Sequence, residues 1–187
     1  MAESLNILVI CGSLRKGSYN AALARALPEL APPGVTFTTA PAYETMPLYN
    51  EDLQNASGFP PAAEAFAAAI RGADGVIIVS PEYNWTIPGA LKNALDWVSR
   101  MKDQPFVNKP VAIQSCSQGP MGGSRMQYHL RQSLVYLKAF TFGVPEVIVS
   151  VAQNKFDKDM KLTDETTRKF VQQQLEGFAK FIARVRD

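Results

Sequence analysis

The chain has 187 residues, of which 47% are hydrophobic and 19% charged, a composition typical of one globular domain that excludes an intrinsically disordered chain. Nineteen lysines and arginines against seventeen aspartates and glutamates give a net charge of +2, too small an excess to indicate a nucleic-acid partner or a polybasic membrane surface. No apolar run approaches the ~20 residues that cross a bilayer, and the start MAESLNILVI lacks the basic segment of an export signal. We therefore expect one cytoplasmic domain over residues 1–187 that contacts neither nucleic acid nor membrane.

Stretches with strand and helix patterns alternate along the whole chain. Short apolar runs rich in β-branched residues predict strands covered on both faces, and the alternating run at 35–40 predicts a strand nearer an edge. Apolar residues at helical spacing predict the helices between them. In chain order the expected elements are strand 5–11, helix 18–28, strand 35–40, helix 60–72, strand 75–80, helix 88–99, strand 110–116, helix 123–139, strand 146–151 and helix 163–186.

This alternation indicates an α/β fold, with a doubly wound parallel sheet of five strands between two layers of helices. Each strand–helix unit takes roughly 30–35 residues, so five units fill the chain and leave no room for a second domain. The longest stretch without a predicted element is 41–59. Because loops longer than ~12–15 residues are usually functional or mobile, this loop is a candidate wall of a site. A surface loop after the second strand, with no part in a site, is an equally good interpretation.

Ligands of open α/β sheets bind beyond the carboxyl ends of the strands, where loops 12–20, 81–88 and 117–123 are expected. The first loop, GSLRKGSYN, combines two glycines and two serines with Arg15 directly before a helix. Backbone N–H groups and hydroxyls at a helix start favour a bound phosphate, although the loop matches neither a Walker A nor a G-x-G-x-x-G motif. The alternative is an ordinary helix start with Ser18 as N-cap and a solvated Arg15.

The second loop carries Tyr83 and Trp85 between two prolines at the end of a central strand. A planar heteroaromatic ligand needs a flat aromatic neighbour and rigid backbone donors, which this stretch offers. Alternatively these aromatic residues close the core or a subunit contact, an interpretation that is stronger for Trp85 than for Tyr83. The third loop has three glycines, which let a ligand approach closely but also make ordinary turns.

Four motifs have a recognisable pattern: GSLRKGSYN at 12–20, PEYN at 81–84, PGALKNALDW at 88–97 and QYHLRQ at 127–132. Together they resemble the NADPH-dependent FMN reductase family, and within it the bacterial chromate and quinone reductase branch. The resemblance implies a flavodoxin-like, three-layer α/β/α fold with strand order 2-1-3-4-5. It also implies that a single domain, residues 1–187, holds FMN without a covalent bond and uses NAD(P)H as co-substrate.

The resemblance also assigns contact residues. The phosphate contacts fall on Ser13, Arg15, Ser18, Tyr19 and Asn20, the isoalloxazine contacts on Pro81, Glu82, Tyr83 and Asn84, and the remaining ring contacts on Ser115, Ser117 and Gly119. It implies no metal and no catalytic side chain, because flavin N5 carries the chemistry. Trp85 stands where relatives often have another aromatic residue.

The activity implied by the resemblance is two-electron reduction of quinones, with chromate, ferric complexes and other small oxidants as further acceptors. NAD(P)H delivers hydride to flavin N5 and leaves before the oxidant binds, which is a ping-pong mechanism. The expected assembly is a homodimer or homotetramer. The alternatives are a flavodoxin-type electron carrier and a free-flavin reductase. Carriers of that kind are generally strongly acidic, whereas this chain has a net charge of +2.

The sequence gives no reason to assign a metal site or a disulfide to Cys11, Cys116 or His129. The two cysteines end strands that another strand separates in the expected order, too far apart for a disulfide, so we expect them to act as small apolar residues. His129 is the only histidine. We expect it to pack on its own helix or at a subunit contact rather than to bind a metal.

Overall fold

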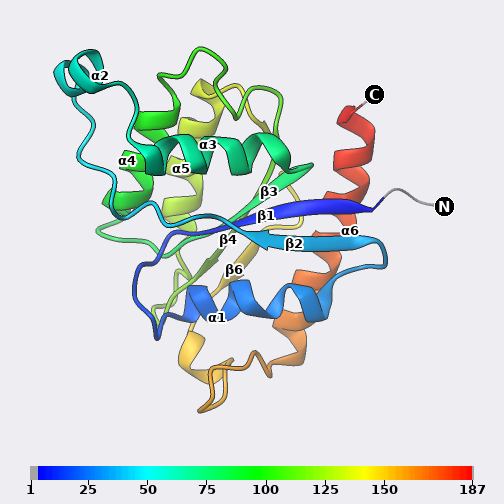
Figure 1. Cartoon of the computed structure of the whole chain (residues 1–187). Helices are drawn as coiled ribbons and strands as arrows, with labels where there is room; N and C mark the ends of the chain where they lie inside the picture. The colour runs from blue at the N-terminus through cyan, green and yellow to red at the C-terminus, as the bar shows by residue number, and fades with distance from the viewer. Residues whose placement is uncertain (1–3, 187) are drawn as a thin grey trace.

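The computed structural model describes residues 4–186, which form an α/β fold around one parallel sheet (Figure 1). The strands are β1 (Leu5–Cys11), β2 (Val35–Thr39), β3 (Gly75–Val79), β4 (Pro110–Cys116), β5 (Phe140–Thr141) and β6 (Val147–Val149). The helices are α1 (Tyr19–Ala26), α2 (Glu51–Ser57), α3 (Pro61–Gly72), α4 (Gly89–Val98), α5 (Ser124–Tyr136) and α6 (Glu165–Arg186). The strand order is β2-β1-β3-β4-β5, with β6 also paired to β4. The flavodoxin-like order expected from the sequence is therefore confirmed.

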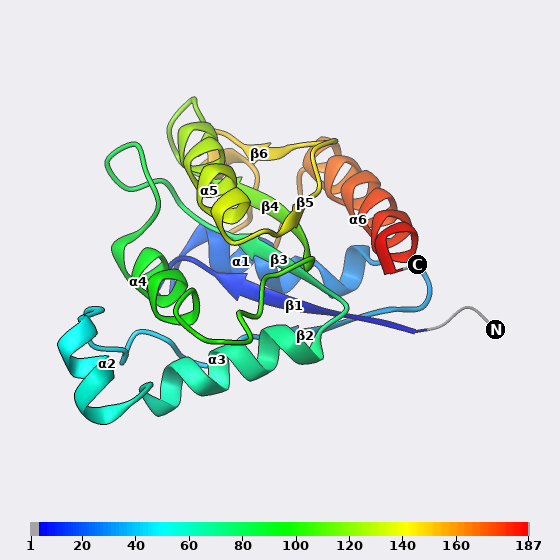
Figure 2. The ribbon, with the colours of Figure 1, turned by 90° about the horizontal axis from the view of Figure 1, so that it is seen from above.

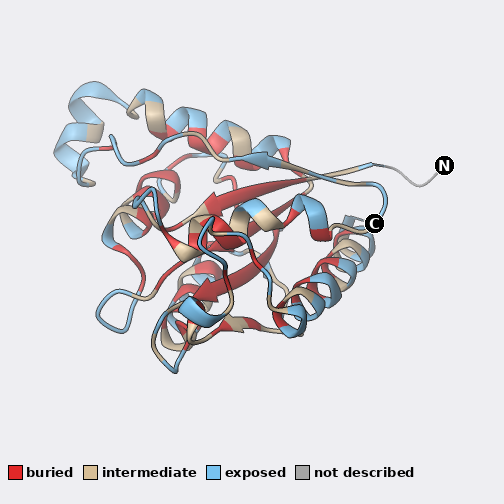
Figure 3. Ribbon diagram, turned by 90° about the horizontal axis from the view of Figure 1, so that it is seen from below, coloured by how far each residue is buried: buried red, intermediate tan, exposed pale blue. Residues whose placement is uncertain are grey.

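Helices cover both faces of the sheet because both faces of its strands are apolar. Along β1, Ile7 and Val9 belong to the cluster packed against α1 and α6, whereas Leu8 and Ile10 belong to the cluster packed against α3, α4 and α5. Side chains of a strand alternate between faces, so an unbroken apolar run requires a helix layer on each side. Figure 2 shows these layers from above, and Figure 3 shows buried strands between helices that are buried only on part of their surface.

The fifth position of the sheet is divided between two short strands. β5 pairs with the first two residues of β4 and β6 with its last three, so the predicted strand 146–151 covers only the second half. Pro145, between them, has no N–H for a sheet hydrogen bond. The side chain of Gln174 on α6 bridges this break, because its Nε2 donates to Pro145 O at 2.8 Å and to Ile113 O at 3.3 Å.

The expectation of a structureless loop at 41–59 is wrong, because this segment contains α2. The side chain of Asn50 caps the helix by accepting a hydrogen bond from the Asp52 N–H at 2.8 Å. Acidic residues occupy the first turn, and Gly58 ends the helix with a φ of 74°. These are ordinary helix start and stop signals, so the sequence pattern was sufficient to predict α2.

The rest of this segment is tied to the body of the fold. Tyr43 Oη donates to Cys11 O, at the end of β1, at 2.7 Å. Trp97 Nε1, on α4, donates to Pro47 O at 2.7 Å. The segment therefore closes one side of the sheet's carboxyl edge, although it supplies no lining to the pocket described below.

The remaining elements lie where the sequence predicts them, within a few residues at their ends. The largest difference is at α5, which ends at Tyr136 rather than at 139. Lys138 has a φ of 56°, a left-handed conformation with which an α-helix cannot continue. None of the helices within residues 4–186 combines the length and the apolar character needed to span a bilayer.

Candidate functional site

Three loops meet at the carboxyl edge of the sheet and enclose a pocket of about 200 Å3. They follow β1, β3 and β4, which are neighbours in the sheet, so loops distant in sequence become adjacent in space. Nine of the twelve predicted contact residues line this pocket: Ser13, Arg15, Ser18, Tyr19, Asn20, Pro81, Glu82, Tyr83 and Ser117. Cys116 and Gln118 line it as well. Their position at and just after the end of β4 is the signal that would have predicted them.

The first loop leaves β1 through a close contact with the neighbouring strand. The Gly12 N–H donates to Val79 O at 2.8 Å, and a Cβ on Gly12 would lie only 2.3 Å from Ser80 Oγ. Glycine is therefore required at this position by the approach of the two strand ends. The contact starts the turn that carries residues 13–17 over the pocket.

Residues 13–17 lie between the end of β1 and Ser18, the N-cap residue of α1. No acceptor within residues 4–186 receives a hydrogen bond from these five N–H groups. Ser18 is the N-cap of α1, since its Oγ accepts from the Asn20 N–H at 3.1 Å. Capping and anion binding are compatible here, because the cap uses the Asn20 N–H and leaves the N–H groups of residues 13–17 without an acceptor in the described part of the chain.

Asn20 holds the first loop to the third. Its Nδ2 donates to Cys116 O at 2.8 Å, and its Oδ1 accepts from the Cys116 N–H at 3.0 Å. The side chain is buried. Asn20 therefore serves first as a bridge between α1 and the end of β4, a role that the predicted phosphate contact did not include.

Glu82 lines the pocket, and its carboxylate is bound by the first turn of α5. Its Oε2 accepts a hydrogen bond from the Met126 N–H at 3.1 Å, in the first turn of α5, and its Oε1 lies 3.6 Å from the Arg125 guanidinium. The N-cap residue of α5, Gly123, has no side chain to offer. Glu82 thus caps α5 from another loop, and Arg125 offsets its negative charge beside the pocket.

Residues 83–86 form a tight turn at the rim of the pocket. The Tyr83 N–H donates to Thr86 O and the Thr86 N–H donates to Tyr83 O, both at 3.0 Å. The central residues, Asn84 and Trp85, have φ values of 49° and 68°, as a type I′ turn requires. Tyr83 lines the pocket, whereas Asn84 does not. Thr86 Oγ1 lies 2.9 Å from Nδ1 of His129, which is the contact that this histidine makes from α5.

The third loop contributes Ser117, whose Oγ accepts from the Gly119 N–H at 3.1 Å. Ser115 and Gly119 do not line the pocket. Ser115 is fully buried, and its Oγ accepts from Gln127 Nε2 at 2.8 Å. These two residues support the loop from behind, and Gln127 is a support that sequence reasoning did not assign to the site.

The two cysteines near the pocket are free thiols. Burial raises the pKa of the Cys116 thiol to about 12 and also raises the pKa of Cys11 above its ordinary value. Both thiols are therefore neutral at physiological pH, and neither is activated as a nucleophile.

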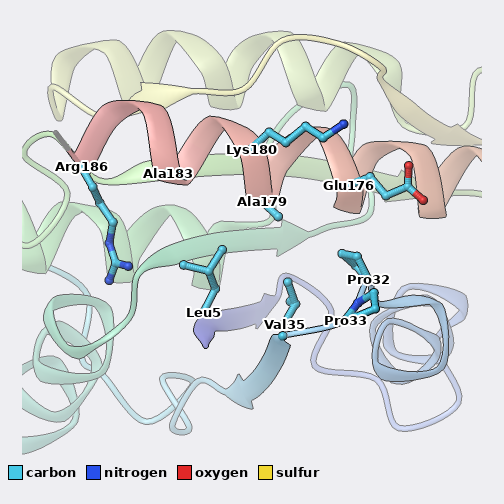
Figure 4. A pocket seen from close by; sticks show the side chains of 10 residues that line it. Leu5, Pro32, Pro33, Val35, Glu176, Ala179, Lys180, Ala183 and Arg186 are labelled. Atoms are coloured by element: carbon cyan, nitrogen blue, oxygen red, sulfur yellow. The ribbon is translucent and has the colours of Figure 1, made fainter. Parts of the chain in front are cut away.

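Larger hollows lie elsewhere on the molecule. Figure 4 shows one of about 650 Å3 at the opposite end of the sheet, between the starts of β1 and β2 and the last turns of α6. Leu5, Val35 and two prolines form its apolar floor, and Lys180 points along its upper edge. It lies away from the carboxyl ends of the strands, where ligands of open α/β sheets bind, so the smaller pocket is the better candidate despite its size.

A family model described as NADPH-dependent FMN reductase matches residues 5–154, which is most of the chain. The chain belongs to this family. It is 48% identical over 187 residues to a quinone reductase of Escherichia coli and 46% identical over 186 residues to an NAD(P)H-dependent FMN reductase of Pseudomonas aeruginosa, with 100% of each chain covered in both comparisons. The solved structure of a flavoenzyme NAD(P)H:(acceptor) oxidoreductase from Paracoccus denitrificans matches with a TM-score of 0.86 at 31% identity, covering 96% of this chain and 98% of that one.

Membership of the family confirms the resemblance that the sequence motifs showed. It also confirms the expected class, an oxidoreductase that uses FMN together with NAD(P)H. The individual flavin contacts stay predictions. Nine of them concern residues that line the pocket.

Proposed function

We propose that this enzyme reduces quinones by two electrons, with NAD(P)H as reductant and FMN held non-covalently by loops 12–20, 81–88 and 117–123. The observation that carries the proposal is the donor set of the first loop. Ser13, Arg15 and Ser18 line one small pocket, and the five main-chain N–H groups of residues 13–17, in the same loop, have no acceptor within residues 4–186. The similarity to enzymes named quinone reductase supports the choice of substrate.

The donor set fits a phosphate monoester. Charge-assisted hydrogen bonds contribute about 1.5–3 kcal/mol each, and micromolar to nanomolar binding requires ~8–12 kcal/mol. A few such bonds therefore provide much of the binding free energy. The enclosed 200 Å3 is smaller than the ~300 Å3 at which pockets for whole ligands begin. We infer that it takes the phosphate end of FMN, and that the ring lies beyond it, toward the half-exposed Tyr83.

The protein's own contribution is to bind and orient. When bound, FMN supplies a centre at N5 that takes hydride from NAD(P)H and gives it to the oxidant, in a ping-pong cycle. Glu82 is engaged by Met126 and Arg125, and burial keeps Cys116 protonated. We therefore assign no side chain of this pocket to proton transfer, and we assign Pro81 and the turn at 83–86 to holding the ring edge in place.

We propose chromate and ferric complexes as further oxidants, because the family resemblance implies them. A cytoplasmic location and assembly into a homodimer or homotetramer stay predictions. The location follows from the composition and the start of the sequence, the assembly follows from the family resemblance, and neither depends on the pocket.

The direct test is to purify the protein and measure its bound flavin and turnover. We expect a yellow protein that contains FMN and oxidises NADH or NADPH with a quinone as acceptor, and more slowly with chromate or ferricyanide. Initial rates at several fixed quinone concentrations should give parallel double-reciprocal lines. Intersecting lines would contradict the ping-pong order, and protein that takes up no FMN would contradict the proposal as a whole.

The same measurements separate the alternatives. A flavodoxin-type carrier would hold FMN but would not oxidise NAD(P)H without a second enzyme. A free-flavin reductase would show turnover that saturates with added FMN and would release reduced FMN into solution. For a quinone reductase with resident FMN, added FMN should not raise the rate once the pocket is filled.

A further inference from the structure

A hollow of about 650 Å3 lies at the amino ends of β1 and β2, beside the last turns of α6 (Figure 4). It is at the opposite edge of the sheet from the candidate flavin pocket, so the binding of FMN does not account for it. Small-molecule sites typically enclose ~300–1,000 Å3. The hollow is therefore large enough to hold a ligand of its own.

The sheet side of this hollow is apolar. Segment 32–35 supplies two prolines and a valine, and Leu5 of β1 lies beside them (Figure 4). Gly34 has a φ of 84°, which glycine adopts without strain, and its carbonyl accepts the Leu5 N–H at 2.8 Å. This hydrogen bond fixes the floor to the start of β1. On the helix side, Ala179 and Ala183 are one turn apart, and their short side chains leave room above the floor.

The charged residues are distributed unequally along the hollow. Glu176 lies at one end and Arg186 at the other (Figure 4), about 15 Å apart along the axis of α6. The Arg186 guanidinium forms an ion pair with Asp74, and the other carboxylate oxygen of Asp74 accepts the Asn6 N–H at 2.7 Å. Because a guanidinium has five N–H donors, this ion pair holds Arg186 in place and leaves donors for a ligand.

Further cations lie close to Arg186. This residue also lines a second hollow, of about 350 Å3, together with Arg71 and Lys109. Asp74 is the one carboxylate among the described residues that line the second hollow, so its lining has an excess of two positive charges. Burial lowers the pKa of the Lys109 amine, and no carboxylate within residues 4–186 forms an ion pair with it. Positive charge at this end of the apolar hollow favours a negatively charged group there.

We infer that the larger hollow binds a free single-chain carboxylate of the medium-chain fatty acid type, with its hydrocarbon chain on the apolar floor and its carboxylate at Arg186. The floor suits the chain because each methylene that leaves water contributes to binding. The charges fix the direction of the chain, since Arg186 attracts the carboxylate and Glu176 repels it. The inference does not depend on the proposed function, because the two sites are at opposite edges of the sheet.

The test is calorimetric titration of the holoenzyme with decanoate, below the concentration at which decanoate forms micelles. We expect saturable binding of one molecule per chain. Octanoate, which is two methylenes shorter, should bind about tenfold more weakly. Decyltrimethylammonium has the same chain as decanoate's tail with a cationic head, and it should bind at least about tenfold more weakly because Arg186 repels it.

Matched variants locate the site. Ala183→Trp should weaken the binding of decanoate at least about tenfold, because the indole takes the space of the chain. Ala68→Trp, at an exposed position of α3 outside both hollows, is its control. Arg186→Gln should weaken binding about tenfold, and Arg186→Lys should restore most of the affinity because it keeps the charge. Arg184→Gln removes an exposed arginine of α6 that lines neither hollow, and it should leave the affinity unchanged.

Steady-state kinetics provide a readout that is independent of the calorimetry. Saturating decanoate should leave the KM for a quinone unchanged, because decanoate binds at the opposite edge of the sheet from the flavin pocket. Competitive inhibition that persists in Ala183→Trp would place decanoate in the flavin site and overturn the inference.

The absence of saturable binding, equal affinities for decanoate and decyltrimethylammonium, or undiminished binding to Ala183→Trp would also overturn the inference. A lower mass of the assembly for Ala183→Trp in sedimentation would show that a second copy of the chain covers the hollow instead. Protein that holds no FMN would refute the proposed function and not this inference, because decanoate can be titrated into the flavin-free protein.

Discussion

Asn20 and Cys116, which are 96 residues apart, exchange two hydrogen bonds: Asn20 Nδ2 donates to Cys116 O at 2.8 Å, and the Cys116 N–H donates to Asn20 Oδ1 at 3.0 Å. A side-chain amide here imitates the pairing of a neighbouring strand. It joins the first turn of α1 to the end of β4, just where the sheet ends. The relative position of the first and third loops of the pocket depends on this pair.

Asn20→Ala should therefore destabilise the protein by about 2–4 kcal/mol, because it leaves two buried main-chain groups of Cys116 without partners. Urea unfolding of the flavin-free protein measures this effect apart from FMN binding. Asn55→Ala, on the exposed face of α2, is the control and should change stability little. A loss for Asn20→Ala no larger than that of the control would contradict the bridging role.

Gly12→Ala tests the close approach of β1 to β3. The new Cβ would lie 2.3 Å from Ser80 Oγ and 2.7 Å from Ser80 Cβ, so we expect a destabilisation of about 1–3 kcal/mol from overpacking. Ser80→Gly removes both clashing atoms. The double variant should consequently be more stable than the sum of the two single effects predicts. Strict additivity in urea unfolding would show that the contact relaxes without cost.

Glu82→Ala should weaken α5 by about 1–2 kcal/mol, since the Met126 N–H loses its acceptor and the helix start loses a favourable negative charge. Glu82→Gln keeps an acceptor oxygen and should lose less than half as much. Thermal unfolding of the two variants, followed by circular dichroism, distinguishes them. Equal losses would mean that the charge, rather than the hydrogen bond, carries the effect.

The buried thiol and phenol predict a decline of stability in alkaline solution. Burial raises the pKa of Cys116 to about 12 and raises the pKa of Tyr43 above its ordinary value. In the unfolded chain a thiol ionises at about 8.5, so unfolding releases protons above that pH and stability falls as pH rises toward the folded value. The urea concentration at the midpoint of unfolding should not change with pH below pH 8 and should fall above it. The fall should be less steep for Cys116→Ala than for the unaltered protein. A midpoint that is independent of pH up to 11 would refute the assigned burial effect.

The rate at which Cys116 is alkylated is a second test of its burial. Iodoacetamide should modify Cys116 in the native protein far more slowly than in urea, because the thiolate is the reacting species and burial suppresses it. Mass spectrometry of peptides after a timed exposure measures the ratio. Native modification at the unfolded rate would contradict the structure around β4.

Local sequence patterns were sufficient to predict the strands, most of the helices and the positions of the three loops. They also contained the signal for α2, because Asn50 and Gly58 mark its two ends. The loops could be predicted to meet because the carboxyl ends of parallel strands share one edge. This is a consequence of topology and does not require knowledge of any side-chain direction.

Side-chain direction is what the sequence left open. Ser115 and Ser117 are two residues apart, yet Ser115 is buried against Gln127 at the end of β4 and Ser117 lines the pocket. Asn20 was expected to face a phosphate, but its partner is a distant main-chain group. The break between β5 and β6 at Pro145 is likewise bridged by Gln174, a residue of α6. Such long-range contacts have no local signature, so only the folded structure reveals them.

The central claim is that the first loop binds the phosphate of FMN, and its most direct test is calorimetric titration of the flavin-free protein with FMN and with riboflavin, which lacks that phosphate. We predict that FMN binds at least about a hundredfold more tightly than riboflavin, because several charge-assisted hydrogen bonds are lost with the phosphate. Arg15→Ala should reduce this preference by about tenfold or more, and Lys16→Ala should reduce it less, because Arg15 lines the pocket and Lys16 does not. Equal affinities for FMN and riboflavin would contradict the claim.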